Sequence, residues 1–153
     1  MQAWNLTGSR GTVVEYTSPD SDNQREKGKT MNLNDLFNHE GYGVMATAAA
    51  DGTVNSAVYA RPHKGEGGEL VWGMTEGRTW RNLAENPHAS YLFMIGGRGW
   101  SGVRLKLKLK ELRDSGEMLD LIRRETARIV SPEAAQAVKH AGYFEVEEVR
   151  PLI

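Results

Sequence analysis

The segment VRLKLKLKEL, residues 103–112, alternates apolar and cationic side chains without a fault from position 103 to position 110. Successive side chains of a β-strand point to opposite faces of the sheet, so the pattern predicts a half-buried strand. The apolar face comprises Val103, Leu105, Leu107 and Leu109, and the basic face Arg104, Lys106, Lys108 and Lys110. The basic face could bind nucleic acid, but the net charge of −1 favours a solvated outer face whose lysines discourage edge pairing. We therefore expect no nucleic-acid partner.

Other strand signals surround this segment. Apolar or alternating runs lie at residues 42–50, 53–61, 70–74, 89–95 and 143–149. The first two flank Asp51-Gly52, a two-residue hairpin signal, and the run ASYLFMI at 89–95 is expected to be buried on both faces. Sequential hairpins without crossover helices indicate an antiparallel sheet. We predict a mainly β (α+β) fold, an antiparallel split β-barrel of about six strands and Greek-key type, with flanking helices.

The flanking helices are marked by their caps. Asn32 can cap a short helix that Gly41 ends, and a second helix runs from the stretch MTEGRTW to Asn86-Pro87. A long helix is expected around residues 116–129. Ser131-Pro132 begins a last helix, which we expect to stop at Gly142.

The 153 residues suit one compact domain, which we place at 31–153. Residues 1–30 include the polar stretch TSPDSDNQREKGKT and are predicted to form a flexible N-terminal arm, although GTVVEY within them could pair as a short strand. The chain has no cysteine, which excludes disulfides and thiolate nucleophiles, and no apolar run long enough to span a bilayer. We expect a soluble cytoplasmic protein that does not bind membranes.

The stretch MTEGRTWRNLAENP, residues 74–87, carries the strongest functional signal. It places Thr75, Arg78, Thr79, Arg81 and Asn82 at the point where a strand gives way to a helix. Unpaired N–H groups and the positive end of the macrodipole at a helix start suit an anion, although a solvated helix start would look similar. Polar Asn55, Ser56 and Arg61 lie on the second strand, and Trp72, Trp80 and Trp100 could flank a planar ligand.

Several other site classes lack their motifs. The four histidines have no metal-ligand spacing, so no metal site is predicted. There is no G-x-S-x-G elbow, no G-x-G-x-x-G between a strand and a helix, and no Walker loop.

Together, the order of elements and three segments resemble the pyridoxamine 5′-phosphate oxidase-like superfamily of split barrels that bind flavin mononucleotide (FMN). The segments are GVMATAAADGTVNSAVYARP, LVWGMTEGRTWRNLAENPHASYLF and GGRGWSGVRLKL. The resemblance implies a homodimer with FMN at the subunit interface. The chain ends EVEEVRPLI in place of the family's substrate-binding tail, so vitamin B6 oxidation is not expected.

The resemblance also assigns roles to residues. Arg78 and Thr79 match the pair that holds the FMN phosphate, with Thr79 where true oxidases carry lysine, and Arg61 matches a basic position that reaches the phosphate. Asn82 matches a helix position that faces the site, and we expect Thr75, from the cluster at the helix start, to belong to the same site. The positions that edge the flavin ring are Asn55, Ser56, Ala57 and Val58, and the loop from the partner subunit contributes Trp100 and Ser101.

Two classes of function remain open. The first is a flavin-dependent oxidoreductase in which FMN carries the electron chemistry, with unknown substrate, electron donor and catalytic residues. The second is a binding protein on the same fold, either an FMN carrier or redox sensor, or a haem- or deazaflavin-binding variant.

Overall fold

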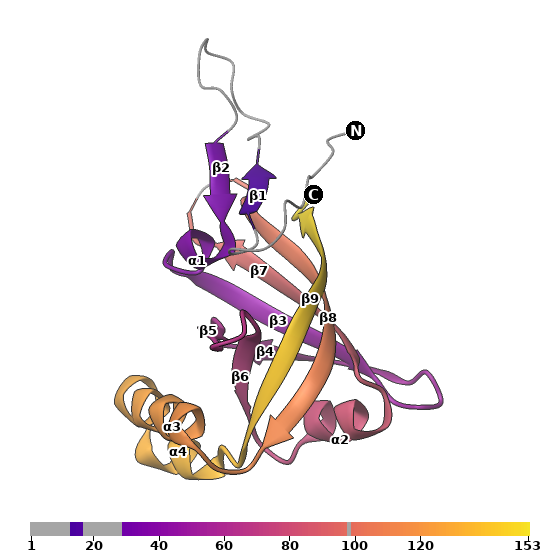
Figure 1. Ribbon diagram of the computed structural model, residues 1–153, viewed down its shortest axis with the longest axis vertical. Helices are drawn as coiled ribbons and strands as arrows, with labels where there is room; N and C mark the ends of the chain where they lie inside the picture. The colour runs from indigo at the N-terminus through magenta and orange to yellow at the C-terminus, as the bar shows by residue number, and fades with distance from the viewer. Residues whose placement is uncertain (1–12, 17–28, 98) are drawn as a thin grey trace.

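The structure, a computed structural model, describes residues 13–16, 29–97 and 99–153 (Figure 1). In chain order its elements are β1 (Val13–Tyr16), β2 (Lys29–Asn32), α1 (Leu33–Leu36), β3 (Gly41–Ala48), β4 (Val54–Tyr59), β5 (His63–Lys64), β6 (Leu70–Met74), α2 (Arg78–Glu85), β7 (His88–Ile95), β8 (Gly102–Arg113), α3 (Glu117–Ile129), α4 (Pro132–Ala137) and β9 (His140–Pro151).

One antiparallel sheet forms the body of the molecule. Its seven strands follow the order β4-β3-β7-β8-β9-β6-β5, and the sheet curls so that one face encloses the core (Figure 1). The edge strands β4 and β5 do not pair with each other, so the barrel is split. The predicted mainly β split barrel with flanking helices is confirmed, with one strand more than expected. That strand is β5, whose two residues are too short to show a period.

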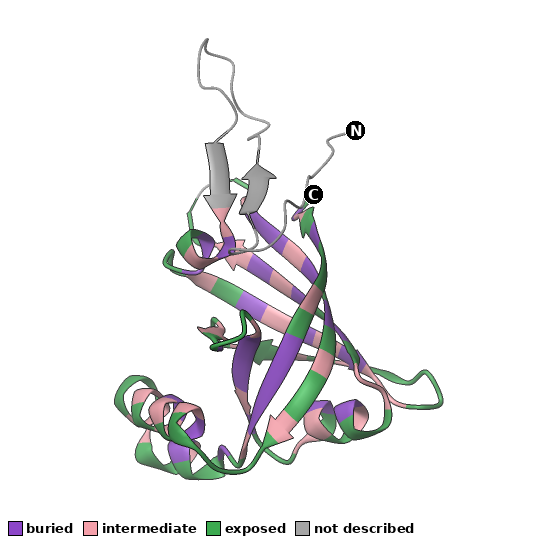
Figure 2. Ribbon diagram, viewed as in Figure 1, coloured by how far each residue is buried: buried purple, intermediate pink, exposed green. Residues whose placement is uncertain are grey.

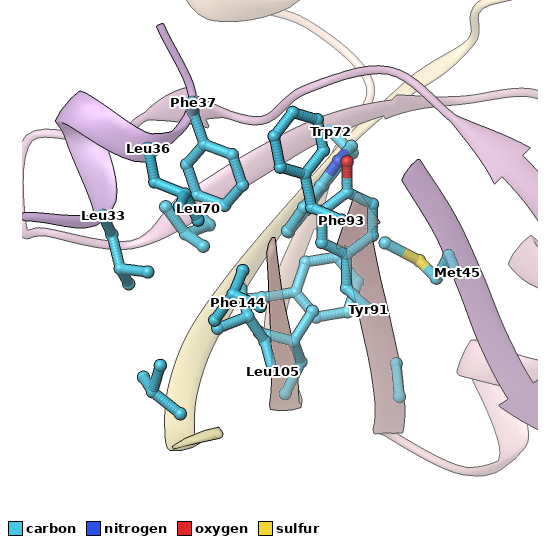
Figure 3. Close-up of a cluster of buried hydrophobic side chains, with 14 of the residues drawn as sticks. Leu33, Leu36, Phe37, Met45, Leu70, Trp72, Tyr91, Phe93, Leu105 and Phe144 are labelled. Carbon is cyan, nitrogen blue, oxygen red and sulfur yellow. The ribbon is translucent and has the colours of Figure 1, made fainter. Parts of the chain in front are cut away.

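The core lies against the inner face of this sheet. On β8 the predicted alternation is observed, with Val103, Leu105 and Leu107 buried. Figure 3 shows aromatic rings gathered in the same core, and the ring centroids of Trp72 and Tyr91 are 4.7 Å apart. Interdigitated rings of this kind give the curled sheet a dense interior.

The segment that connects β4 to β5 across the split is hydrogen-bonded to side chains of the core. The carbonyl oxygen of Ala60, just after β4, accepts hydrogen bonds from Trp72 Nε1 at 2.8 Å and from the Tyr91 hydroxyl at 2.9 Å. The Tyr91 hydroxyl passes so close to Gly43 that any Cβ at that position would overlap it. Two buried donors on one acceptor therefore fix the end of β4.

The strand buried on both faces is β6, and the prediction that the run 89–95 would be so buried is wrong. On β7 the alternate residues Ala89, Tyr91 and Phe93 are buried, whereas Ser90 is exposed (Figure 2). The helices explain the difference, since α3 and α4 cover the outer side of β6. There Val71 packs in a second cluster with Leu119, Ile122, Val138, Ala141 and Tyr143.

The helices are close to their predicted places, but two end early. The first, α1, is capped by Asn32, whose Oδ1 accepts from the N–H of Asn34 at 2.9 Å, and it ends before Gly41. The last, α4, ends at Ala137 instead of Gly142, because β9 begins at His140 and pairs there with Met74 of β6.

The N-terminal region is described in part. β1 pairs with β2 in a separate antiparallel sheet of two strands, as GTVVEY allowed. Most of the predicted arm, residues 1–12 and 17–28, lies outside the described residues, so its flexibility and the domain boundary at residue 31 stay predictions. Within the described chain, no helix combines the length and apolar character needed to cross a membrane.

Candidate functional site

The N-terminus of α2 is open to a ligand. Its N-cap, Gly77, has no side chain to accept from the first N–H groups, and the first turn contains no carboxylate. The other described helices each have a capping side chain or acidic residues in the first turn: Asn32 and Asp35 on α1, Glu117 and Asp120 on α3, Ser131 and Glu133 on α4. The N–H groups and positive dipole end of α2 are therefore available to an anion.

Thr79 joins this helix start to the edge strand β4. Its side chain is buried at 4% exposure, and its Oγ1 accepts a hydrogen bond from Asn55 Nδ2 at 3.5 Å. The Tyr59 hydroxyl also interacts with Thr79. Burial raises the pKa of Tyr59, and the Thr79 hydroxyl partly offsets that rise. Hence the hydroxyls of Thr79 and Tyr59 and the amide of Asn55 meet where α2 faces β4.

Two further hydrogen bonds hold α2 against β3 and the turn that follows it. Asn82 Nδ2 donates to Oγ1 of the buried Thr47 at 3.1 Å, and the N–H of Ala50 donates to Glu85 Oε2 at 3.0 Å. The sequence assigned Asn82 to the ligand site, and the structure shows that its amide also supports the helix. Thr47 was not singled out from the sequence.

The solvent side of the helix start carries a cation and an aromatic stack. Arg78 is exposed at the first helical position. The ring of Trp80 stacks on that of His140 with centroids 5.2 Å apart, and His140 Nε2 lies 3.2 Å from Glu76 Oε1. The indole Nε1 of Trp80 is buried and has no hydrogen-bond partner within the described part of the chain. Glu76 and His140 were not predicted, because they lie 64 positions apart in the sequence.

The predicted ring-edging residues on β4 divide between its two faces. Asn55 and Ala57 are half-buried, whereas Ser56 and Val58 are exposed, as the alternation along the strand requires. Asn55 faces Thr79, so Ser56 and Val58 point to the outer side of the sheet. A ligand beside Thr79 within one subunit therefore meets the side chains of Asn55 and Ala57.

Three other predicted residues lie away from α2. Arg61 follows β4, and its Nη1 donates to the carbonyl oxygens of Phe37 at 3.2 Å and His39 at 3.1 Å, at the end of α1. Trp100 and Ser101 lie in the loop after β7, whereas α2 precedes that strand, so the strand separates them from α2 (Figure 1). Thr75, by contrast, lies next to α2, where it is exposed in the turn before the helix.

An apolar stripe covers the outer face of β4, β3 and β7. Val54 and Val58 on β4 and Tyr42 on β3 are exposed, and Val58 keeps 80% of its surface. Val44 pairs with Val58 on one side and Leu92 on the other, which makes the stripe continuous across the three strands. Exposed, continuous apolar surface is typical of interaction sites.

No family model matches the sequence, and no curated protein matches it. Several solved structures, however, are similar to this chain in fold. An FMN-binding protein from Syntrophomonas wolfei superposes with a TM-score of 0.67 at 18% identity, covering 77% of this chain and 82% of that one. A candidate pyridoxamine 5′-phosphate oxidase from Listeria innocua gives 0.61 at 15% identity, with 78% and 94% covered. The haem storage protein HutZ from Vibrio cholerae gives 0.55 at 14% identity, with 78% and 91% covered. The chain therefore has the pyridoxamine 5′-phosphate oxidase-like split-barrel fold.

Proposed function

We propose that the protein binds FMN without covalent attachment and that the phosphate sits at the N-terminus of α2. One observation carries the proposal: the open start of α2 presents Arg78 to solvent beside the buried Thr79 and the half-buried Asn55 that bonds to it. A phosphate there would accept from backbone N–H groups, from the Thr79 hydroxyl and from the planar fork of Arg78. The similarity in fold to an FMN-binding protein supports this choice.

The residues present suit the rest of the cofactor. Asn55 and Ala57, both half-buried on β4, would edge the ring system, and the Asn55 amide can both donate and accept. When bound, FMN supplies reversible hydride and electron transfer. The protein positions it, screens it from water and holds the phosphate.

We also propose a two-fold homodimer that buries the apolar stripe on β4, β3 and β7. Trp100 and Ser101 lie in the loop after β7, and α2 lies before that strand, so we assign their expected contact with the flavin to the partner's copy. A self-complementary contact through one sheet face is the geometry of a two-fold dimer. The stripe thus supports a dimer contact through this face of the sheet.

Within this assignment we favour a cytoplasmic flavin-dependent oxidoreductase, because Arg78, Thr79 and Asn55 would hold a redox cofactor at the edge of the barrel. A haem-binding role has less support from the site. His140 is already engaged, stacked on Trp80 and paired with Glu76.

The cofactor is tested by denaturing the purified protein and analysing the released chromophore, then adding FMN, haem or deazaflavin separately to the stripped protein. We expect uptake of FMN. Haem or deazaflavin taken up in its place would contradict the assignment. Bleaching of the bound flavin by a nicotinamide cofactor without oxygen would support the enzyme, and a flavin that ignores reductants would support a carrier.

A further inference from the structure

A cavity of about 390 Å³ lies between the end of β4, the strand β6 and the helix α3. It occupies the split of the barrel, where the chain crosses from β4 to β5. Its apolar lining comes from Tyr59, Trp72, Ile122, Ile129, Val130 and Val138. The volume falls at the lower end of the range found for small-molecule sites, roughly 300–1,000 Å³.

The charged groups around the cavity already have partners. Arg61 donates to the carbonyl oxygens of Phe37 and His39, and His63 Nε2 lies 3.6 Å from Glu125 Oε2. Arg61 keeps its positive charge, because carbonyl oxygens are neutral, and the Glu125 carboxylate is neutralised only by a protonated His63. The lining therefore combines apolar side chains with two charged ones.

Exposed apolar residues lie beside the cavity at the end of α3. Ile129 and Val130 contribute to its lining yet keep 64% and 70% of their surface exposed. They flank the C-terminal end of the helix, where polar residues are usual, so their exposure makes an apolar entrance for a ligand arriving from solvent.

Tyr59 connects this cavity to the site on α2. Its side chain lines the cavity, and its hydroxyl interacts with Thr79, the residue assigned to the FMN phosphate. A ligand in the cavity would therefore lie next to a ring placed along β4. We propose that the cavity is the substrate pocket and takes a largely apolar molecule of one or two rings. The role of this ligand as a substrate rests on the proposed flavin function, whereas its binding in the cavity does not.

The test is equilibrium dialysis of 2-naphthol against full-length, flavin-free protein at pH 7. We expect saturable binding at one site per chain. No saturable binding, or more than one equivalent site per chain, would overturn the proposal.

Variants locate the site. Ile129→Glu and Val130→Glu alter exposed positions, so the variants should still fold, and each should weaken 2-naphthol binding by about tenfold. The matched control Gln136→Glu adds the same charge on α4, away from the lining, and should change nothing. Equal effects of all three variants would place the binding elsewhere.

FMN titration of the same samples separates the two proposals. Protein that binds FMN but not 2-naphthol would refute only the substrate pocket. Protein that binds 2-naphthol but not FMN would refute only the flavin site.

Discussion

Asn82 on α2 donates a hydrogen bond from Nδ2 to Thr47 Oγ1 on β3 at 3.1 Å, across 35 positions of sequence. Thr47 is buried, so this bond forms where water competes little. Together with the bond from Ala50 to Glu85, it ties the helix that carries Arg78 and Thr79 to β3 and the turn after it. The proposed phosphate site therefore depends on a bond that makes no contact with the phosphate.

Replacing Asn82 with alanine should lower the free energy of unfolding by about 1–2 kcal/mol, because the buried Thr47 hydroxyl loses its partner. Urea denaturation measures this. Thr47→Val added to Asn82→Ala should cost less than the sum of the two single changes, since the pair acts as a unit. Arg81→Ala, at an exposed position of the same helix, is the control and should stay within about 0.5 kcal/mol of wild type. Additive losses would show that the two side chains are not coupled.

Thr79→Val keeps the shape of the side chain and removes its hydroxyl. We expect FMN to bind about tenfold more weakly, because the phosphate loses one charge-assisted hydrogen bond. Thr79→Ser keeps the hydroxyl and should bind FMN nearly as well as wild type. Fluorescence titration of flavin into the stripped proteins gives both affinities. Equal affinities in the valine and serine variants would exclude the hydroxyl from the site.

The protein should lose stability in alkaline solution through Tyr91. Burial raises the pKa of Tyr91 well above its ordinary value, so the folded state holds this proton more tightly than the unfolded chain does. The resulting stabilisation is complete below the unfolded pKa of about 10 and is lost as pH rises through the folded value. Burial also raises the pKa of Tyr59, so this residue should likewise lower stability in alkaline solution.

Unfolding free energies of wild type and Tyr91→Phe, measured at neutral pH and above about pH 10, test this. At neutral pH the variant should be less stable by about 1 kcal/mol, since Ala60 loses one of its two donors. Its further decline at high pH should be shallower than that of wild type. A parallel decline of both proteins would mean that Tyr91 does not couple to stability in this range.

Val58→Lys should weaken the proposed homodimer. It places a charge in the middle of the apolar stripe at a position 80% exposed in the single subunit, so the subunit itself should still fold. Sedimentation should show the variant dissociating at concentrations where wild type remains dimeric. Gln136→Lys, exposed on α4, adds the same charge and should leave assembly unchanged. A wild-type protein that is monomeric with FMN fully bound would refute the shared site.

Local patterns in the sequence were sufficient to predict most of the fold. The alternation along β8 and the hairpin between β3 and β4 depend on neighbouring residues only. The loop of this hairpin is longer than the expected two residues: the N–H of Gly52 donates to the Ala49 oxygen at 3.0 Å, and Asp51 accepts from the N–H of Thr53 at 2.9 Å. The burial of β7 was mispredicted because it depends on which strands the helices cover. Its half-buried Leu92 belongs to the apolar stripe that we assign to the dimer.

The site was predictable only in part. The place of Arg78 and Thr79 at the start of a helix was predictable, because one short motif contains both residues and the helix start. Pairs such as Glu76 with His140 join distant segments and carry no periodic signal, so only the folded arrangement brings them together. The orientation of Arg61 toward the carbonyl oxygens of Phe37 and His39 likewise depends on where α1 ends.

The central claim, a phosphate held at the start of α2, is tested most directly by comparing FMN and riboflavin binding to wild type and Arg78→Ala. Riboflavin lacks the phosphate, so any loss confined to FMN reports that contact alone. Arg78 makes charge-assisted bonds worth roughly 1.5–3 kcal/mol, so the variant should bind FMN about ten- to a hundredfold more weakly and riboflavin almost as wild type does. An unchanged FMN affinity, or an equal loss for riboflavin, would contradict the account.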